Sequence, residues 1–195
     1  MNYTTKIAKE TTDPKILTDI LREGKNNSVS RYAARNLSCP KEILVEILRR
    51  GKDDYVSRFA ALNPNCPKEI LVEILKRRKN DSVSEFAANN PNCPKEMLVE
   101  ILKRRKSNCV SSRAADNPNC PPEILVEVLE RGKKDLVSYW ASINPNCPIE
   151  AKINWMMKTG QIVKEDPSKH IIEYEKIKED DFQDLKDLLK SFKKP

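Results

Sequence analysis

The stretch Asn63-Pro64-Asn65-Cys66-Pro67-Lys68-Glu69-Ile70-Leu71-Val72-Glu73-Ile74-Leu75 decides the fold of this chain, because near-copies of it recur along most of the sequence. Its Cys-Pro pair returns every 27 residues, at Cys39-Pro40, Cys66-Pro67, Cys93-Pro94, Cys120-Pro121 and Cys147-Pro148. A unit of this size cannot bury its apolar face alone and must stack on its neighbours. The sequence therefore predicts a repeat array.

Each unit is predicted to hold two helices. Pro67 is expected to be the first residue of the first helix, with Glu69 reaching back to the free amide at the helix start. A stripe of apolar residues follows at helical spacing: Ile70, Leu71, Ile74 and Leu75. A second helix of under three turns is predicted between a cap at Asn80-Asp81-Ser82 and a stop at Asn90-Pro91.

The repeated turn, with Ile/Met-Leu-Val-Glu after it, resembles the variant leucine-rich repeat family over roughly residues 13–148. The resemblance implies an all-α fold, a right-handed superhelical solenoid of about 27-residue two-helix repeats, in which an α-helix alternates with a short α or 3-10 helix. Two features depart from the family. Some members carry an iron–sulfur module ahead of the repeats, but no cysteine precedes Cys39. Serine replaces the arginine that often follows the valine of the second helix: Ser30, Ser57, Ser84, Ser111 and Ser138.

The chain is predicted to have three parts. Residues 1–12 form an N-terminal cap or arm, residues 13–160 form five to six repeats, and residues 161–195 form a C-terminal cap. An alternative for the last part is an amphipathic arm that docks on a partner. A helix predicted there, from Asp180 to Phe192, has apolar residues on one side: Phe182, Leu185, Leu188 and Leu189.

Composition favours a soluble, cytoplasmic protein, with 38% hydrophobic and 33% charged residues, no apolar run long enough for a membrane and no signal-peptide profile. Stacked helices lie about 8–10 Å apart, which is too far for a disulfide between equivalent cysteines. Five cysteines are therefore expected to be small buried residues at helix starts: Cys39, Cys66, Cys93, Cys120 and Cys147. Cys109 lies in a turn and is expected to be the accessible thiol. With a single histidine, His170, and no Cys-x-x-Cys pair, the sequence predicts no metal and no cofactor.

Residues 1–148 carry the whole net charge of +7, with 26 Lys or Arg against 19 Asp or Glu. Basic residues cluster after the first helices and stack into what we call the basic ridge: Arg49, Arg50, Lys52; Lys76, Arg77, Arg78, Lys79; Lys103, Arg104, Arg105, Lys106; Arg131, Lys133, Lys134. One interpretation is that they only end helices and pair with glutamates four residues earlier, as Arg77 with Glu73. However, Arg78 and Arg105 occupy the helix-ending slot that glycine fills in other units. The candidate contacts for phosphate or an acidic partner are Arg78, Lys79, Arg105 and Lys106.

A second candidate surface lies on the second helices. One slot reads Tyr32, Phe59, Phe86, Arg113 and Trp140, and aromatic residues at this spacing are more often packing than ligand contacts. Arg113 interrupts the row, either lying against an aromatic face or emerging as an anion contact. The neighbouring positions Arg31, Arg58, Glu85, Ser112 and Tyr139, together with Tyr55, differ between units, either because they read a partner or because they are unconstrained surface. The candidate residues here are Arg58, Glu85, Ser112, Arg113 and Tyr139.

The sequence offers no catalytic group: four glycines form no phosphate loop, and no repeat pairs a nucleophile with a histidine. We expect a non-enzymatic scaffold that binds another protein. The alternative is a nucleic-acid binder that holds a phosphate backbone on the basic ridge, as HEAT-like DNA-binding solenoids do. An enzyme of the HEAT-like DNA glycosylase kind is a weaker third hypothesis, since no positioned acid or aromatic pocket is found. No membrane and no small-molecule substrate is indicated.

Overall fold

Each 27-residue unit forms two helices, because each half carries apolar residues at helical spacing between strong stop signals. The computed structural model describes residues 3–161, and these residues contain helices and no strand. The first helices of the units are α2 (Pro14–Arg22), α4 (Lys41–Arg49), α6 (Lys68–Lys76), α8 (Lys95–Lys103) and α10 (Pro122–Glu130). The second helices are α3 (Ser28–Arg35), α5 (Tyr55–Leu62), α7 (Ser82–Asn89), α9 (Cys109–Asp116) and α11 (Leu136–Ile143). The predicted all-α repeat solenoid is confirmed.

Two further helices flank the repeats. Helix α1 (Thr5–Glu10) packs on α3 in the place that a second helix would take. Helix α12 (Ile149–Lys158) belongs to a separate compact unit that starts at Pro148, and the chain leaves it through Gly160 at φ 68°. The last Cys-Pro pair, Cys147-Pro148, is therefore followed by a helix as the earlier pairs are. The predicted C-terminal cap or arm at 161–195 lies outside the described residues, apart from Gln161.

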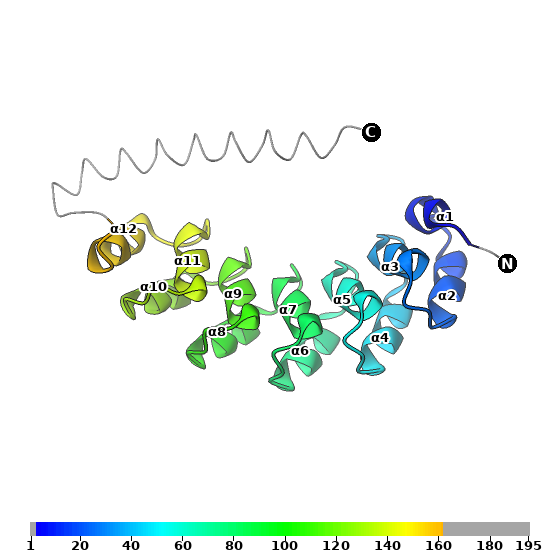
Figure 1. Cartoon of the computed structure of the whole chain (residues 1–195), viewed down its shortest axis with the longest axis horizontal. Coiled ribbons are helices and arrows are strands. Elements are labelled where there is room, and N and C mark those ends of the chain that lie inside the picture. The colour runs from blue at the N-terminus through cyan, green and yellow to red at the C-terminus, as the bar shows by residue number, and fades with distance from the viewer. Residues whose placement is uncertain (1–2, 162–195) are drawn as a thin grey trace. The chain divides into compact units, whose positions relative to one another are not determined.

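Within Met1–Cys147, the second helices pack on one another more extensively than the first helices do. The reason is a pair of small residues in each second helix, such as Ala60-Ala61 and Ala87-Ala88, which are fully buried and let neighbouring backbones approach closely. In Figure 1 the odd-numbered helices of this unit accordingly form the inner row of an arc, and the even-numbered helices form its outer row.

The core of the repeats is the apolar stripe that the sequence predicts. Ile70, Leu71, Ile74 and Leu75 are all buried, and so are their equivalents in α4, α8 and α10 and three of the four in α2, where Ile16 is half-buried. The cysteine at the start of each unit from Cys39 to Cys147 lies in the same core as an unbridged thiol, and burial raises the pKa of the Cys66 thiol to about 12. Cys109 is exposed, as expected.

The start of the first helix differs from the prediction. Pro67 is the N-cap of α6 rather than its first helical residue, with φ −63° and ψ 141°. The expected reach of Glu69 back to a free amide at the cap was wrong for a chemical reason: the cap is proline, which has no N–H to donate. The predicted cap of the second helix is present, because the Asp81 carboxylate accepts a hydrogen bond from the Ser84 amide at 2.8 Å.

A ladder of buried asparagines links each unit to the one before it. The Asn90 side chain donates to the carbonyl oxygens of Ala61 at 2.6 Å and Asn63 at 2.9 Å, while its Oδ1 accepts from the Asn92 amide at 2.7 Å. The same three hydrogen bonds recur at Asn63, Asn117 and Asn144. At the N-terminal end, Asn36 donates to carbonyls of the α1 segment. The helix-stopping asparagine is therefore also the polar bond between repeats.

The longest helix in residues 3–161 is α12 with ten residues, about half of what a membrane crossing requires, and no described helix meets that requirement.

Candidate functional site

The loops after α6 and α8 hold two arginines in a strained backbone conformation. Arg78 has φ 56° and Arg105 has φ 55°, in the left-handed region that disfavours side chains with a Cβ. Glycine fills the equivalent place after α2, α4 and α10, with φ between 64° and 68°. The Arg78 amide donates to Leu75 O at 3.2 Å, the same bond that Gly51 makes to Leu48 O. The two central units therefore keep an arginine where the backbone favours glycine.

Part of the basic ridge is neutralised by glutamates of the first helices. Arg77 pairs with Glu73 at 2.9 Å and Arg104 with Glu100 at 2.7 Å, and the latter hydrogen bond holds the pKa of Glu100 below its ordinary value. Arg78, whose side chain is 71% exposed, lies only at the 4.0 Å limit from Glu100. Lys79, Arg105 and Lys106 are exposed and form no ion pair with another described residue. Three of the four ridge candidates thus carry positive charge that no described carboxylate neutralises, and Arg78 is only weakly paired.

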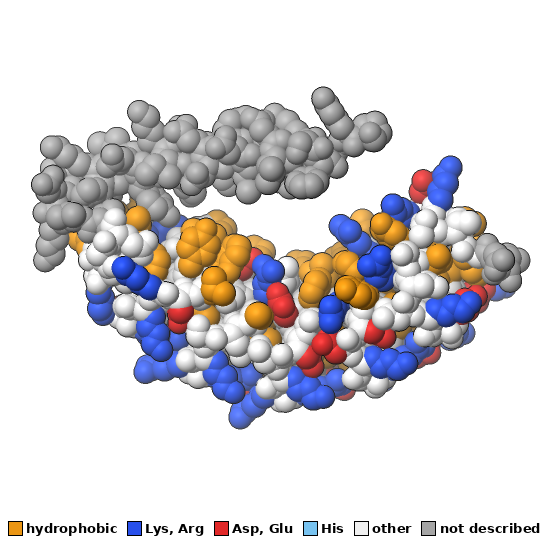
Figure 2. Space-filling view, in the orientation of Figure 1, with side chains coloured by type: hydrophobic (Ala, Val, Ile, Leu, Met, Phe, Trp, Pro, Cys, Tyr) orange, Lys and Arg blue, Asp and Glu red, His pale blue; other side chains and the backbone are white. Residues whose placement is uncertain are grey.

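The second helices present a different surface, which we call the second-helix face. It consists of the side chains that α1, α3, α5, α7, α9 and α11 turn away from the core. Large apolar and aromatic groups are exposed there: Tyr55 (51%), Leu136 (65%), Tyr139 (51%) and Ile143 (43%). Figure 2 shows hydrophobic side chains gathered along this row of helices, with basic side chains among them near α1 and α3.

Cations lie over the rings at one end of the second-helix face. Lys9 Nζ is 4.1 Å from the centre of the Tyr32 ring, and the guanidiniums of Arg31 and Arg58 lie 5.3 and 5.0 Å from the centre of the Tyr55 ring. Such contacts hold a cation in place without neutralising its charge. This end of the face therefore combines aromatic packing with positive potential.

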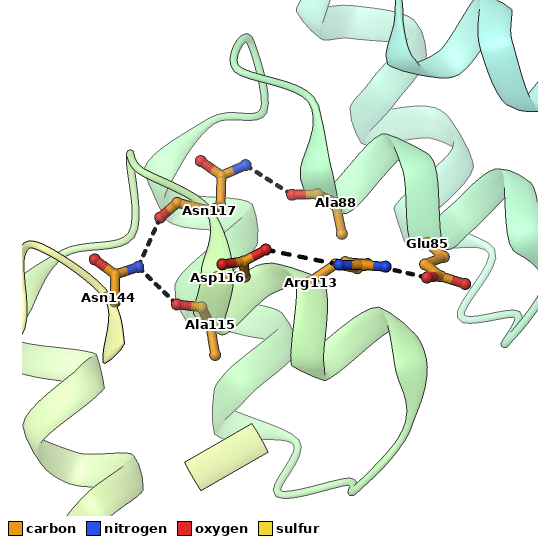
Figure 3. A network of polar contacts seen from close by, with 7 residues as sticks. All are labelled: Glu85, Ala88, Arg113, Ala115, Asp116, Asn117 and Asn144. Carbon is orange, nitrogen blue, oxygen red and sulfur yellow. Dashed lines mark hydrogen bonds and ion pairs between the residues drawn. The ribbon is translucent and has the colours of Figure 1, made fainter. Parts of the chain in front are cut away.

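Arg113 lies in the middle of the second-helix face, within a closed ion-pair network (Figure 3). Its Nε donates to Glu85 on α7 at 3.0 Å, its Nη1 lies 3.7 Å from Asp116, and its guanidinium is 5.8 Å from the centre of the Trp140 ring. Burial raises the pKa of Asp116, and the Arg113 charge opposes that rise. Of the two predicted alternatives, the structure shows Arg113 against an aromatic face, with its charge already paired.

The predicted site residues fall into two separate groups. Arg78, Lys79, Arg105 and Lys106 lie in the loops between the two helices of a unit, whereas Arg58, Glu85, Ser112, Arg113 and Tyr139 lie on second helices. Arg58 pairs with Asp53 at 3.3 Å, Tyr139 is half exposed, and Ser112 is buried. A partner on the second-helix face cannot reach the Ser112 side chain directly.

Sequence reasoning missed several exposed residues of the second-helix face: Lys9, Arg35, Leu136 and Ile143. The missed signal was helical spacing inside a single unit. Leu136, Tyr139, Trp140 and Ile143 follow one another at steps of three, one and three, which places them on one face of α11. A comparison of equivalent positions between units does not reveal that stripe, because the stripe lies within one helix.

Residues 3–161 contain no group of three His, Cys, Asp or Glu side chains arranged to hold a metal ion. A polar cavity of about 200 Å³ lies beside α2 and α3, lined by Glu23, Lys25 and Asn27 among others.

Comparison with known proteins gave no match: no family model, no curated protein and no solved structure is similar to this chain.

Proposed function

We propose that the chain is a non-enzymatic, cytoplasmic scaffold that binds another protein on its second-helix face, and that it belongs to the variant leucine-rich repeat family. The observation that carries the binding proposal is the exposure of Tyr55, Leu136, Tyr139 and Ile143 along one row of helices. Protein interfaces are enriched in tyrosine, tryptophan and arginine, all of which occur on this face. Leu136, Tyr139 and Ile143 lie together on one helix, α11, and an exposed apolar patch of this kind marks an interaction site.

The first helices support this assignment by contrast. Their outward side chains are mostly lysine and glutamate, such as Lys68, Glu69, Lys95 and Glu96, which are exposed. Charged residues of this kind are depleted from the centres of protein interfaces. Binding energy is therefore expected from the second helices and little from the first.

Site-specific photo-cross-linking tests the proposal. Tyr139 is replaced by a photoreactive phenylalanine derivative, the full chain is irradiated in native lysate, and the same is done at Lys68 as a matched exposed position. We expect one dominant protein adduct at position 139 that is absent at position 68 and that survives nuclease treatment. Equal labelling at both positions, or no adduct at 139, would contradict binding on the second-helix face.

A second candidate function is binding of a nucleic-acid phosphate backbone, which the backbone conformation of Arg78 and Arg105 favours. A side chain kept in the left-handed region costs stability, and such positions cluster at functional sites. Each arginine is followed by a lysine, Lys79 or Lys106, that forms no ion pair within residues 3–161, so each loop offers two adjacent cations. Phosphate oxygens are a natural partner for such a pair.

Replacing both arginines by glycine tests this second function cleanly. Arg78→Gly with Arg105→Gly removes two charges and relieves the backbone, so weaker binding could not be attributed to unfolding. We expect affinity for a mixed-sequence duplex to fall, and the log-log slope with salt to shrink by about 0.9 for each lost phosphate contact. Lys68→Ala with Lys95→Ala removes the same charge from the other ends of the first helices and serves as control. Absence of duplex binding at low salt would eliminate this function.

A further inference from the structure

The second-helix face changes its chemistry from one end to the other. Helices α3 and α5 contain three arginines and no acidic residue, whereas α11 contains no charged residue at all. Figure 2 shows blue side chains gathered near α1 and α3, while orange side chains lie along the row, the α11 end included. A uniform partner would not match both ends.

At the basic end, the cations are held in position yet keep their charge. Lys9 lies over Tyr32, Arg31 over Tyr55 and Arg35 over Phe59, the last with its guanidinium 6.0 Å from the ring centre. None of these three cations pairs with a carboxylate among the described residues, whereas Arg58 pairs with Asp53. Side chains that are ordered before binding lose little entropy when an anion arrives. This end is prepared for carboxylates of a partner.

At the apolar end, α11 presents Leu136, Tyr139 and Ile143 to solvent beside Trp140. The Tyr139 and Trp140 rings pack edge to face, with centroids 5.5 Å apart, which fixes both rings as a rigid surface. Because α11 has no cation, it offers no charge partner to a phosphate or a carboxylate. It suits a large apolar side chain.

Between the two ends, Arg113 is neutralised by Glu85 and Asp116. The middle of the face therefore neither attracts nor repels a charged ligand strongly, and it separates the two ends. Neighbouring helices lie about 8–10 Å apart, so α3, which holds Arg31 and Arg35, and α11, four steps away in the row, are separated by about 32–40 Å. An extended segment of about 10–12 residues, or a helix of about 21–27 residues, spans that distance.

We infer that the partner of the second-helix face is a peptide segment with two parts: acidic side chains that contact Arg31 and Arg35, and a large apolar side chain that packs on α11. The inference rests on the proposed protein-binding function and names the chemistry of its ligand. Charge complementarity carries the acidic half, and exposure of the α11 stripe carries the apolar half.

Selection from a displayed library of random peptides of about 27 residues, long enough to span from α3 to α11 as a helix, tests the inference. The full chain is the bait. We expect enriched peptides to combine an Asp/Glu cluster with a Leu, Phe or Trp separated from it in sequence. Their affinity should fall about tenfold or more in the Arg31→Ala, Arg35→Ala double variant and lose most of its salt dependence, as rim charges do. The Tyr139→Ser, Ile143→Ser variant should lose the apolar preference and keep the salt dependence.

Two controls make the outcome decisive. Lys68→Ala with Lys95→Ala removes equal charge from the first helices and should leave peptide affinity unchanged, and far-UV circular dichroism should show that every variant stays helical. Enriched peptides without acidic residues, or affinity that ignores Arg31 and Arg35, would overturn the two-part ligand while leaving a protein adduct at position 139 intact. Failure to enrich any peptide, together with no adduct at 139, would instead overturn the protein-binding function. Displacement of the peptide by a single-stranded oligonucleotide would assign the basic end to nucleic acid.

Discussion

The first and second helices of each unit differ in what varies between repeats. The first helices repeat nearly the same residues, Lys-Glu-Ile-Leu-Val-Glu-Ile-Leu in α4 and α6, and bury the same four apolar side chains. The second helices keep a valine, a serine and a small pair for packing but change at their exposed positions, from Arg31 and Arg58 to Glu85 and Tyr139. The first helices therefore hold the array together, while the exposed positions of the second helices are free to carry binding specificity.

A cavity in the core formed by the first helices should lower the free energy of unfolding more than any other change proposed here. Leu98 is fully buried in α8, and Leu98→Ala is expected to lower the free energy of unfolding by about 2–5 kcal/mol, because a cavity replaces packed atoms. Urea denaturation followed by circular dichroism measures the change. Tyr139→Ala on the second-helix face should cost less than about 1 kcal/mol. Equal losses would mean that the exposed face is part of the core.

Removing one rung of the asparagine ladder should come next. Asn90→Ala leaves the carbonyls of Ala61 and Asn63 and the Asn92 amide without their partner in a buried site, at an expected cost of about 2–4 kcal/mol. The neighbouring Asn92 is the matched control, because its side chain also bonds to the previous unit, at Pro64 O and Cys66 O, but is exposed. Asn92→Ala should cost less than about 1 kcal/mol. If thermal melts showed equal losses of stability for the two variants, burial would not be what makes the asparagine ladder strong.

Replacing a strained arginine should change the free energy of unfolding by a smaller amount, and it should raise this free energy rather than lower it. Arg78→Gly is expected to raise the free energy of unfolding by about 0.5–1 kcal/mol, because glycine adopts a positive φ without a Cβ clash. The reciprocal change Gly51→Ala, at φ 68°, should lower it by about 1 kcal/mol. A destabilised Arg78→Gly protein would show that the arginine contributes contacts beyond its exposed position.

The reactivity of the cysteines tests which parts of the repeats are buried. It does so without changing the stability of the protein near neutral pH. Burial raises the pKa of Cys39, Cys66, Cys93 and Cys120 from 9.0 to about 12, so these thiols stay protonated in the folded chain at pH 9. A thiol reagent at pH 8 should therefore modify one thiol per folded chain, Cys109, and all six only after denaturation. Rapid reaction of more than one thiol in the folded protein would contradict the burial of the other five cysteines.

The same shift predicts how stability depends on alkaline pH. The folded-state pKa of these thiols lies above the unfolded value, so the unfolded chain releases protons first as pH rises. Their contribution to stability is complete below about pH 9 and is lost as pH rises toward 12. Denaturation midpoints measured at pH 7, 9 and 10 should decline after pH 9, and a variant with alanine at the four positions should decline less.

The sequence predicted much of the fold because each unit contains the local signals that start and end its own helices. The Cys-Pro turn, the Ile-Leu stripe and the Asn-Pro stop recur in register, so the repeat period, the buried stripe and the exposed Cys109 followed from local rules. The helix start was misassigned by one residue at Pro67, because proline is compatible with both the cap and the first turn. The candidate residues on the second helices were found by comparing units, which did not show that Ser112 is buried or that Leu136 and Ile143 are exposed.

The sequence by itself determined that this protein is a helical repeat array with a basic body, because periodicity and charge are properties of the chain alone. Only the tertiary structure decided two further points. The asparagine that stops each second helix bonds to the preceding unit, and Arg113 is neutralised by Glu85 from a neighbouring helix. Both are contacts between residues more than 25 positions apart. Local sequence rules specify neither of them, because stacking decides which groups meet.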